Sequence, residues 1–430
     1  MIKRENLLQK ATYLPLITII SVIFSIGLFF YSMKITVHGF KIFMPEISLV
    51  AFTLVGIPSL LLSKVKIDLK YLLITLVLLG LMSLSSFLSI KPMVSFKEAL
   101  RWAEILVAFF LTLHLVRRVG EVKAILTAIV LMGIFQSLWG MKLLSSLPPG
   151  GRLVTPYFDN PNLLALYLDF SPLLIAGLFF AKKELQWRIG WVYCLAVVGT
   201  SLYLTGTLGS RISNGFVLVL FFLAFLYQKT GKERILRILK AVVSLFFKGL
   251  IVLFFLFLFI VSFFPGLTES LLKKTETGIL SHLSSRFYFY TTGFQIIEDF
   301  PLTGVGGNLY KEVAPYYIPL YSPKKFTEAL KTYHLHSLFF KIAAENGLVV
   351  LMVFLFFLSF VGKDVFSSLS VLEGERYWLM VGAAGSTLTW LLHNIMDEGF
   401  SFMGIQWGIL LGLAVAIKKV QQIEATRDRS

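Results

Sequence analysis

Residues 250–264 read LIVLFFLFLFIVSFF, a stretch without a single charged residue. A helix on the surface of a soluble core shows polar residues at every third or fourth position, and this stretch does not. The whole chain has the same character, because 57% of its 430 residues are hydrophobic, only 15% are charged, and its mean hydropathy is +0.79. Soluble domains are about a quarter charged. The sequence therefore predicts an integral membrane protein.

Apolar runs of membrane-spanning length recur along the whole chain. A helix needs roughly 20 residues to cross a bilayer. We therefore predict an all-α integral membrane protein of about 12 transmembrane helices, which forms a single polytopic domain over residues 1–430. The expected spans are 13–32, 44–63, 70–90, 99–116, 122–141, 160–181, 187–205, 211–228, 243–264, 335–361, 377–395 and 401–417.

The basic residues between these runs indicate the orientation. Cytoplasmic loops of membrane proteins carry an excess of Lys and Arg. If the N-terminus is cytoplasmic, most Lys and Arg residues fall in cytoplasmic segments, including a dense linker that contains Lys229, Lys232, Arg234, Arg237 and Lys240. We therefore predict that both termini are cytoplasmic.

The segment 265–334 contains no run that could cross a membrane, and by the same charge pattern it lies outside. It is rich in the turn formers Pro and Gly, yet its many aromatic residues argue against disorder. Residues 286–298 show the pattern of an amphipathic helix. Long ordered loops are usually functional, so we expect a periplasmic loop that folds back onto the helices and carries the chemistry.

Several function classes lack their motifs. The net charge of +16 does not indicate nucleic-acid binding, because the basic residues fall in short clusters between apolar runs. The sequence has no Walker A motif, no HExxH motif and no Cys/His cluster, and its single cysteine, Cys194, lies in an apolar run. We therefore expect no nucleotide-driven motor, no metal and no cofactor. A transferase at the outer face would need a donor that is already activated.

Two arginines are candidates for binding an anionic group. Arg211 stands at the outer end of the 211–228 span, among Gly and Ser residues that allow a ligand to come close. Arg286 opens the amphipathic stretch of the loop. Two forked guanidinium groups could bind a diphosphate. The alternatives are an interfacial Arg211 that reaches water, and a surface ion pair of Arg286 with Glu298 or Asp299.

His334 and His336 stand where the loop re-enters the membrane. The positive end of a helix dipole favours neutral imidazole, and neutral imidazole can take a proton from a sugar hydroxyl. The alternative is an interfacial histidine with a structural hydrogen bond. His393, at the outer end of the 377–395 span together with Asp397, could line the same cavity.

Two asparagines begin the 160–181 span. Asn160 and Asn162 flank Pro161, and capping of the helix is their simplest role. Arg152 precedes them and could reach the same pocket. We therefore count Arg152, Asn160 and Asn162, together with His334 and His393, as candidates for substrate binding.

Four motifs follow one another in the chain: Arg152 with Asn160-Pro161-Asn162-Leu163-Leu164-Ala165; Ser210-Arg211; Arg286 with Pro301-Leu302-Thr303-Gly304-Val305-Gly306; and His336 with Glu345-Asn346-Gly347-Leu348. In this order and approximate spacing they resemble the O-antigen ligase and O-antigen polymerase superfamily (WaaL/Wzy-like). Ser337 stands where that family has Asn, and Tyr290 stands where it often has Trp.

The resemblance implies a metal-independent, inverting glycosyltransferase of the bacterial inner membrane, with a periplasmic active site. Its donor would be a glycan on undecaprenyl diphosphate, and its acceptor would be lipid A-core or a similar glycan. By position, Arg211 and Arg286 would hold the diphosphate, and His336 would activate the acceptor hydroxyl.

The acceptor stays open. An O-antigen polymerase would extend another undecaprenyl-linked unit, and a protein O-oligosaccharyltransferase would modify Ser or Thr. The single outer loop of moderate length favours the ligase. A lipid-linked-sugar flippase or transporter would place charges near mid-membrane, whereas the candidate charges lie at one face. A scaffold for other assembly proteins is the remaining alternative.

Overall fold

The computed structural model describes residues 34–37, 40–62, 66–144, 146, 151–156, 158, 160–230, 237, 241, 244, 248, 279–317, 335–397 and 400–427. Within these residues, seven helical segments are long and apolar enough to cross a membrane: Leu69–Phe87, Val119–Leu144, Pro161–Ala181, Leu185–Thr205, Leu208–Gln228, Leu348–Leu369 and Met403–Thr426. The chain is thus a multi-span membrane protein whose candidate spans are helical. The expected spans 13–32 and 243–264 lie outside the described residues.

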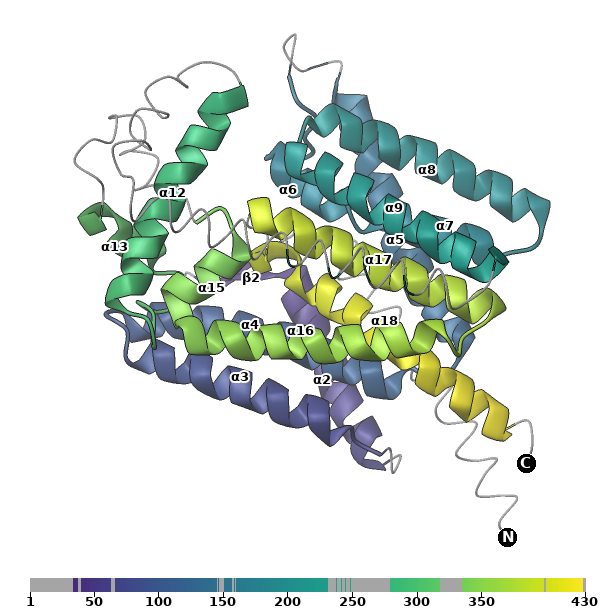
Figure 1. Ribbon diagram of the computed structural model, residues 1–430, viewed down its shortest axis with the longest axis horizontal. Coiled ribbons are helices and arrows are strands. Elements are labelled where there is room, and N and C mark those ends of the chain that lie inside the picture. Colours follow the sequence, from purple (N-terminus) through teal and green to yellow (C-terminus); the bar gives the residue numbers. More distant parts are fainter. Residues whose placement is uncertain are drawn as a thin grey trace.

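The helices lie side by side in an elongated bundle (Figure 1). They are α2 (Met44–Leu62), α3 (Leu69–Phe87), α4 (Pro92–Leu115), α5 (Val119–Leu144), α6 (Pro161–Leu168), α7 (Ser171–Ala181), α8 (Leu185–Thr205), α9 (Leu208–Thr230), α12 (Ile279–Asp299), α13 (Tyr310–Val313), α15 (Leu338–Asn346), α16 (Leu348–Leu369), α17 (Gly374–Met396) and α18 (Phe400–Arg427), with the 3-10 helix η1 (Ala314–Tyr317). A short antiparallel hairpin, β1 (Lys34–Val37) with β2 (Phe40–Phe43), precedes α2 and is absent from the sequence prediction.

The centre of the bundle is built on α17 and α18. α18 packs against α4 and α17, and α17 packs also against α7 and α9. The α7–α17 contact is close because glycines face each other: a Cβ added to Gly177 would lie 2.9 Å from the Cα of Gly382. Small residues allow this approach where lipid gives helices no hydrophobic reason to associate.

The predicted span 335–361 is wrong in its boundaries. The chain forms a short helix, α15, and then a separate spanning helix, α16, divided at Gly347. Gly347 has φ +91, and an added Cβ would lie 2.1 Å from the carbonyl oxygen of Leu302. The turn after Pro301 thus occupies the space that a continuous helix would need, and the amide of Leu348 donates to the Pro301 carbonyl at 2.8 Å. The expected span 160–181 also contains a break, because Asp169 and Phe170 separate α6 from α7.

The described part of the segment 265–334 forms helices at one end of the bundle. The amphipathic helix expected at 286–298 is present within α12, which stands at an angle to the spanning helices beside α13 and α15 (Figure 1). A buried ion pair fixes α15 to α4: Lys341 Nζ lies 3.1 Å from Glu98 Oε1. The carboxylate of Glu345 accepts the backbone amides of Asn308 and Tyr310. These contacts hold α15, and so the residues just before it, in one place.

Candidate functional site

The carboxylate of Asp397 joins three segments that are distant in sequence. Asp397 follows the last residue of α17 and is 6% exposed. Its Oδ1 lies 3.1 Å from His336 Nδ1, and its Oδ2 accepts the side-chain amide of Asn162 at 2.9 Å. Arg286 on α12 approaches the same oxygen, with its Nη2 at 4.0 Å. Residues from α6, from α12 and from the segment just before α15 therefore meet at a single acid.

His336 is held in place by α12. The Tyr290 hydroxyl donates to the backbone carbonyl of His336 at 3.0 Å. The ring of Phe289 meets the imidazole edge to face, with the ring centroids 5.0 Å apart. α15 begins at Leu338 with Ser337 as its N-cap, so His336 precedes the helix, whereas the sequence placed it in the first turn. Its side chain is 28% exposed and can be reached from outside the bundle.

Asp397 is ionised at neutral pH. Burial alone would raise the pKa of its carboxyl, but the hydrogen bond and charge of His336 and the charges of His393 and Arg286 outweigh burial and lower the pKa to about 2. An ionised carboxylate can only accept hydrogen bonds, so Nδ1 of His336 carries the proton in this contact. In the neutral ring, Nε2 then holds the lone pair that can accept a proton.

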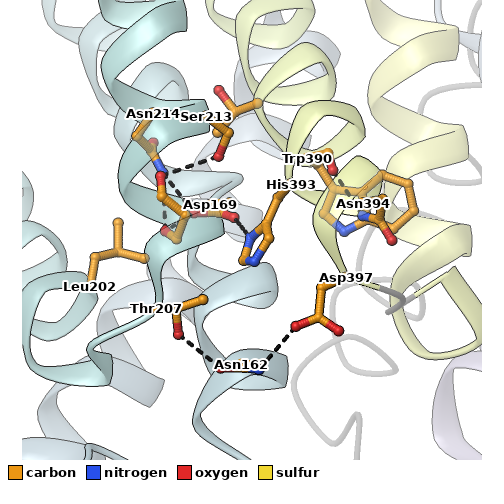
Figure 2. Close-up of polar contacts among 12 residues, drawn as sticks. Asn162, Asp169, Leu202, Thr207, Ser213, Asn214, Trp390, His393, Asn394 and Asp397 are labelled. Atoms are coloured by element: carbon orange, nitrogen blue, oxygen red, sulfur yellow. Dashed lines mark hydrogen bonds and ion pairs between the residues drawn. The ribbon is translucent and has the colours of Figure 1, made fainter. Parts of the chain in front are cut away.

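Arg152 extends the network on the other side of Asp397. Its guanidinium donates to the Asn162 side-chain carbonyl at 2.7 Å, to the Thr207 hydroxyl at 3.0 Å and to the Thr205 carbonyl at 2.5 Å. Thr207 also donates to the Asn162 carbonyl at 3.2 Å. Figure 2 shows Asn162 between Thr207 and Asp397. Asn162 thus bridges Arg152 and Asp397, the acid that contacts His336.

Arg211 lies at the edge of this group. Its Nη2 donates to the Tyr203 carbonyl at 3.1 Å, and its guanidinium lies over the Tyr203 ring, 5.0 Å from the centroid. No described contact joins Arg211 directly to Asp397, His336 or Arg286. Burial lowers the pKa of Arg152, and repulsion by the nearby charge of Arg211 lowers it further. The attraction of Asp397 acts in the opposite direction and does not cancel them.

The other predicted site residues differ in their positions. Asn160 caps α6, as the sequence suggested, by accepting the Asn162 amide at 2.8 Å. His393 is fully buried one helical turn before Asp397, and its Nδ1 lies 2.5 Å from Asp169 Oδ2. Arg286 contacts Asp397, whereas Asp299 accepts the hydroxyl of Tyr317. His334 lies outside the described residues.

Two functional candidates were missed or underrated in the sequence. Asp169 was not singled out, although an acidic residue inside the apolar 160–181 run is a signal in itself, because ionisable residues in spans are rare and usually functional. Asp397 was expected only to support the cavity. Its contacts with the 162 and 336 positions depend on long-range packing that no local pattern contains.

Three arginines (Arg152, Arg211 and Arg286) lie with His336 and the buried Asp397 at one end of the bundle. This arrangement can bind an anion and can accept a proton at one stated atom, His336 Nε2. Within the described residues, no group of three or more His, Cys, Asp and Glu side chains is arranged to hold a metal ion.

Residues 192–355 match the family model described as O-antigen ligase. The match runs from within α8 into α16 and includes Arg211, Arg286 and His336; Arg152, Asn162 and Asp397 lie outside it. No curated protein matches the chain. Enzymes of the matched family are glycosyltransferases that use lipid-linked donors. The resemblance predicted from the motifs is therefore confirmed over this segment: residues 192–355 of this multi-pass membrane protein are similar to the O-antigen ligase family.

Proposed function

We propose that this protein is an O-antigen ligase-type glycosyltransferase, which moves a glycan from undecaprenyl diphosphate to lipid A-core at the periplasmic face. The observation that supports this most is the meeting of His336, Arg286 and Asn162 at Asp397. His336 can accept a proton and Arg286 can bind a phosphate, and both lie beside the same carboxylate. A transfer from a diphosphate donor requires both groups at one site.

The arginines bind the leaving group in this proposal. Arg286 and Arg211 come from separate elements, α12 and α9, and Arg152 lies near Arg211. Guanidinium groups bind phosphate oxygens through paired, charge-assisted hydrogen bonds. They also stabilise the negative charge that grows on the diphosphate as its bond to the sugar breaks. Arg286 also approaches Asp397, with its Nη2 4.0 Å from Oδ2.

His336 and Asp397 act on the acceptor. Nε2 of His336 takes the proton of the acceptor hydroxyl, whose oxygen forms a bond to the anomeric carbon of the donor. The bond from that carbon to the diphosphate oxygen breaks, and its electron pair leaves with the diphosphate. Attack from the face opposite the leaving group inverts the anomeric centre. Asp397 holds the imidazole in the required tautomer and stabilises the imidazolium that forms.

The acceptor is tested by expressing the chain in a bacterial strain that lacks its own O-antigen ligase and following the lipopolysaccharide bands. Restoration of the full ladder on lipid A-core supports the ligase. A ladder restored only in a strain that lacks its polymerase identifies a polymerase. If the ladder is restored in neither strain, the proposal is overturned.

Transfer in isolated membranes should persist in EDTA. Loss of transfer on chelation, with rescue by a divalent ion, would contradict metal-independent transfer.

Arginine is required at positions 211 and 286 for its shape as well as its charge. We expect R286A and R211A to abolish transfer, and R286K and R211K to restore little of it, because a point charge does not reproduce a planar fork. Transfer rates are measured in isolated membranes at matched protein levels. K91M is the matched control, since Lys91 forms an exposed ion pair with Glu312 in the same half of the molecule. Full activity in both lysine variants would remove the diphosphate-binding role.

The orientation is tested by labelling cysteines at the two ends of the bundle. Tyr316 is 86% exposed beside the loop helices, and Gln422 is exposed near the end of α18. With Cys194 changed to Ser, Y316C should react with an impermeant maleimide in intact spheroplasts, and Q422C should react only after lysis. The opposite pattern would place the site in the cytoplasm and remove the periplasmic reaction.

A further inference from the structure

We propose that Asp169 and His393 form a buried positioning pair, which sets the relative position of the helices that carry Arg211, Asn162 and Asp397. The proposal rests on the proposed function for the roles of those three residues. The pair itself touches no substrate in this proposal; it acts through the residues that do.

One carboxylate connects three membrane segments. Asp169, at the junction of α6 and α7, receives the Ser210 hydroxyl at 2.5 Å and the Asn214 amide at 2.6 Å, both from α9. Its other oxygen contacts His393 Nδ1 on α17 at 2.5 Å. Asp169 and His393 are both 0% exposed, and Ser210 is 1% exposed. A polar group so deep in the protein contributes to stability only when its partners are in place.

The same three segments meet again at the outer site. Asn162 lies in the first turn of α6, Thr207 immediately precedes α9, and Asp397 immediately follows α17. Figure 2 shows these contacts as two levels, with the Asp169–His393–Asn214 contacts at one level and the Thr207–Asn162–Asp397 contacts at the other. His393 and Asp397 are four residues apart, or roughly 6 Å along a helix. A shift of α9 or α17 at the level of Asp169 therefore moves a candidate site residue at the level of Asp397.

Arg211 is the residue most directly coupled to the pair. It follows Ser210, whose hydroxyl is bonded to Asp169, and its amide donates to the Thr207 carbonyl at 3.3 Å. The first turn of α9 is thus held from inside by the carboxylate. Asp397 is coupled through the helix, because its amide donates to the His393 carbonyl at 3.0 Å.

The packing around His393 leaves it little freedom. A Cβ added to Gly209 would lie 2.6 Å from His393 Cδ2 and 2.8 Å from its Nε2. Glycine at position 209 therefore allows the first turn of α9 to lie against the imidazole. Within the described residues, Nε2 of His393 is buried and has no hydrogen-bond partner. The tight fit and the Nδ1 contact thus fix the ring, and it has no second bond to compensate if Asp169 is changed.

The test uses the full chain in membranes and compares variants of the pair with one matched control. D169N leaves one acceptor oxygen for the three partners, H393L removes the imidazole, G209A displaces the ring without changing a charge, and H393N keeps an N–H at the Nδ1 position. The control is S386A, because the Ser386 hydroxyl on α17 is also fully buried and donates to the carbonyl of Phe170, the neighbour of Asp169. The measurements are kcat and KM for transfer, the affinity for undecaprenyl diphosphate, and the thermal unfolding midpoint.

Misplacement of a substrate-positioning group by about 1 Å can lower a rate by about 10²-fold. We therefore expect D169N, H393L and G209A to lose about 10²-fold in kcat and to bind undecaprenyl diphosphate more weakly. H393N should recover most of the loss. S386A should change neither kcat nor the affinity for undecaprenyl diphosphate, although it also removes a buried hydrogen bond and should lower the unfolding midpoint. A merely structural role predicts that loss of activity follows loss of stability in every variant, with S386A included, and that result overturns the inference.

The inference and the proposed function fail in different ways. If the wild type transfers glycan and binds undecaprenyl diphosphate while D169N and H393L equal it in both, only the positioning pair is overturned. If the wild type neither transfers glycan nor binds the diphosphate lipid, the proposed function is overturned and the inference with it.

Discussion

Replacing His336 with alanine is expected to lower the rate of glycan transfer by about 10²–10⁴-fold, the usual contribution of a positioned general base. The physical reason is the contact of His336 Nδ1 with the ionised Asp397, which directs the lone pair of the neutral ring to Nε2. The rate is measured in isolated membranes at matched protein levels. The control is H114Q, because His114 lies at the other end of the bundle, where its Nε2 accepts the Asp68 amide.

A second variant separates base catalysis from acceptor binding. H336Q keeps a hydrogen-bonding group but cannot accept a proton at neutral pH, so we expect it to be nearly as slow as H336A. Near-normal turnover in H336Q would leave His336 a binding role only.

H334A should lower the transfer rate less than H336A does. A dead H334A beside a fully active H336A would show that the sequence motif had been placed two residues too late.

Replacing Asp397 with asparagine is expected to have an effect of similar or larger size. The carboxylate accepts from His336 and Asn162 and faces Arg286, and an amide cannot accept from all three. In Ser–His–Asp enzymes, the same change to the acid that holds the histidine lowers kcat by about 10⁴-fold, because the wrong tautomer results. We expect a loss on the order of 10³–10⁴-fold for D397N, measured as for His336.

The pH dependence distinguishes Asp397 from a passive neighbour. Its pKa is lowered to about 2, so its ionised form contributes stability that is fully present above the ordinary pKa of about 4 and is lost as pH falls toward 2. Wild type and D397N should therefore differ in unfolding midpoint at pH 7 and converge near pH 2. A difference that does not change with pH would contradict an ionised Asp397. Because Asp397 stays ionised, a fall in wild-type activity between pH 8 and pH 5 has to come from another group.

Local sequence was sufficient for the features that depend on short-range physics. Long apolar runs gave spanning helices at 69–87, 119–144 and 208–228, close to their predicted places, since a bilayer core demands about 20 apolar residues. The Asn160-Pro161 cap was also predicted, because a cap satisfies amides within its own first turn. The family motifs identified Arg211, Arg286 and His336 as candidates, and the family model covers all three.

The same local patterns failed where a distant segment decides the outcome. The apolar run after His336 looks continuous, but the turn at Pro301–Gly304 occupies the space beside Gly347 and divides it into two helices. His393 was predicted to line the cavity, and its contact with the buried Asp169 was not predicted. In each case, the sequence of one segment carries no signal that the other segment lies beside it.

The sequence by itself thus determined that the chain enters the membrane many times, which family its central segment resembles, and which residue types could bind a diphosphate and take a proton. Hydropathy and charge act on each segment separately, so a linear reading captures them. Only the tertiary structure decided that Asp397 joins His336, Arg286 and Asn162, and that Asp169 joins α9 to α17 one level deeper. Such contacts link positions dozens to hundreds of residues apart, and they exist only when helix packing has brought those positions within hydrogen-bond distance.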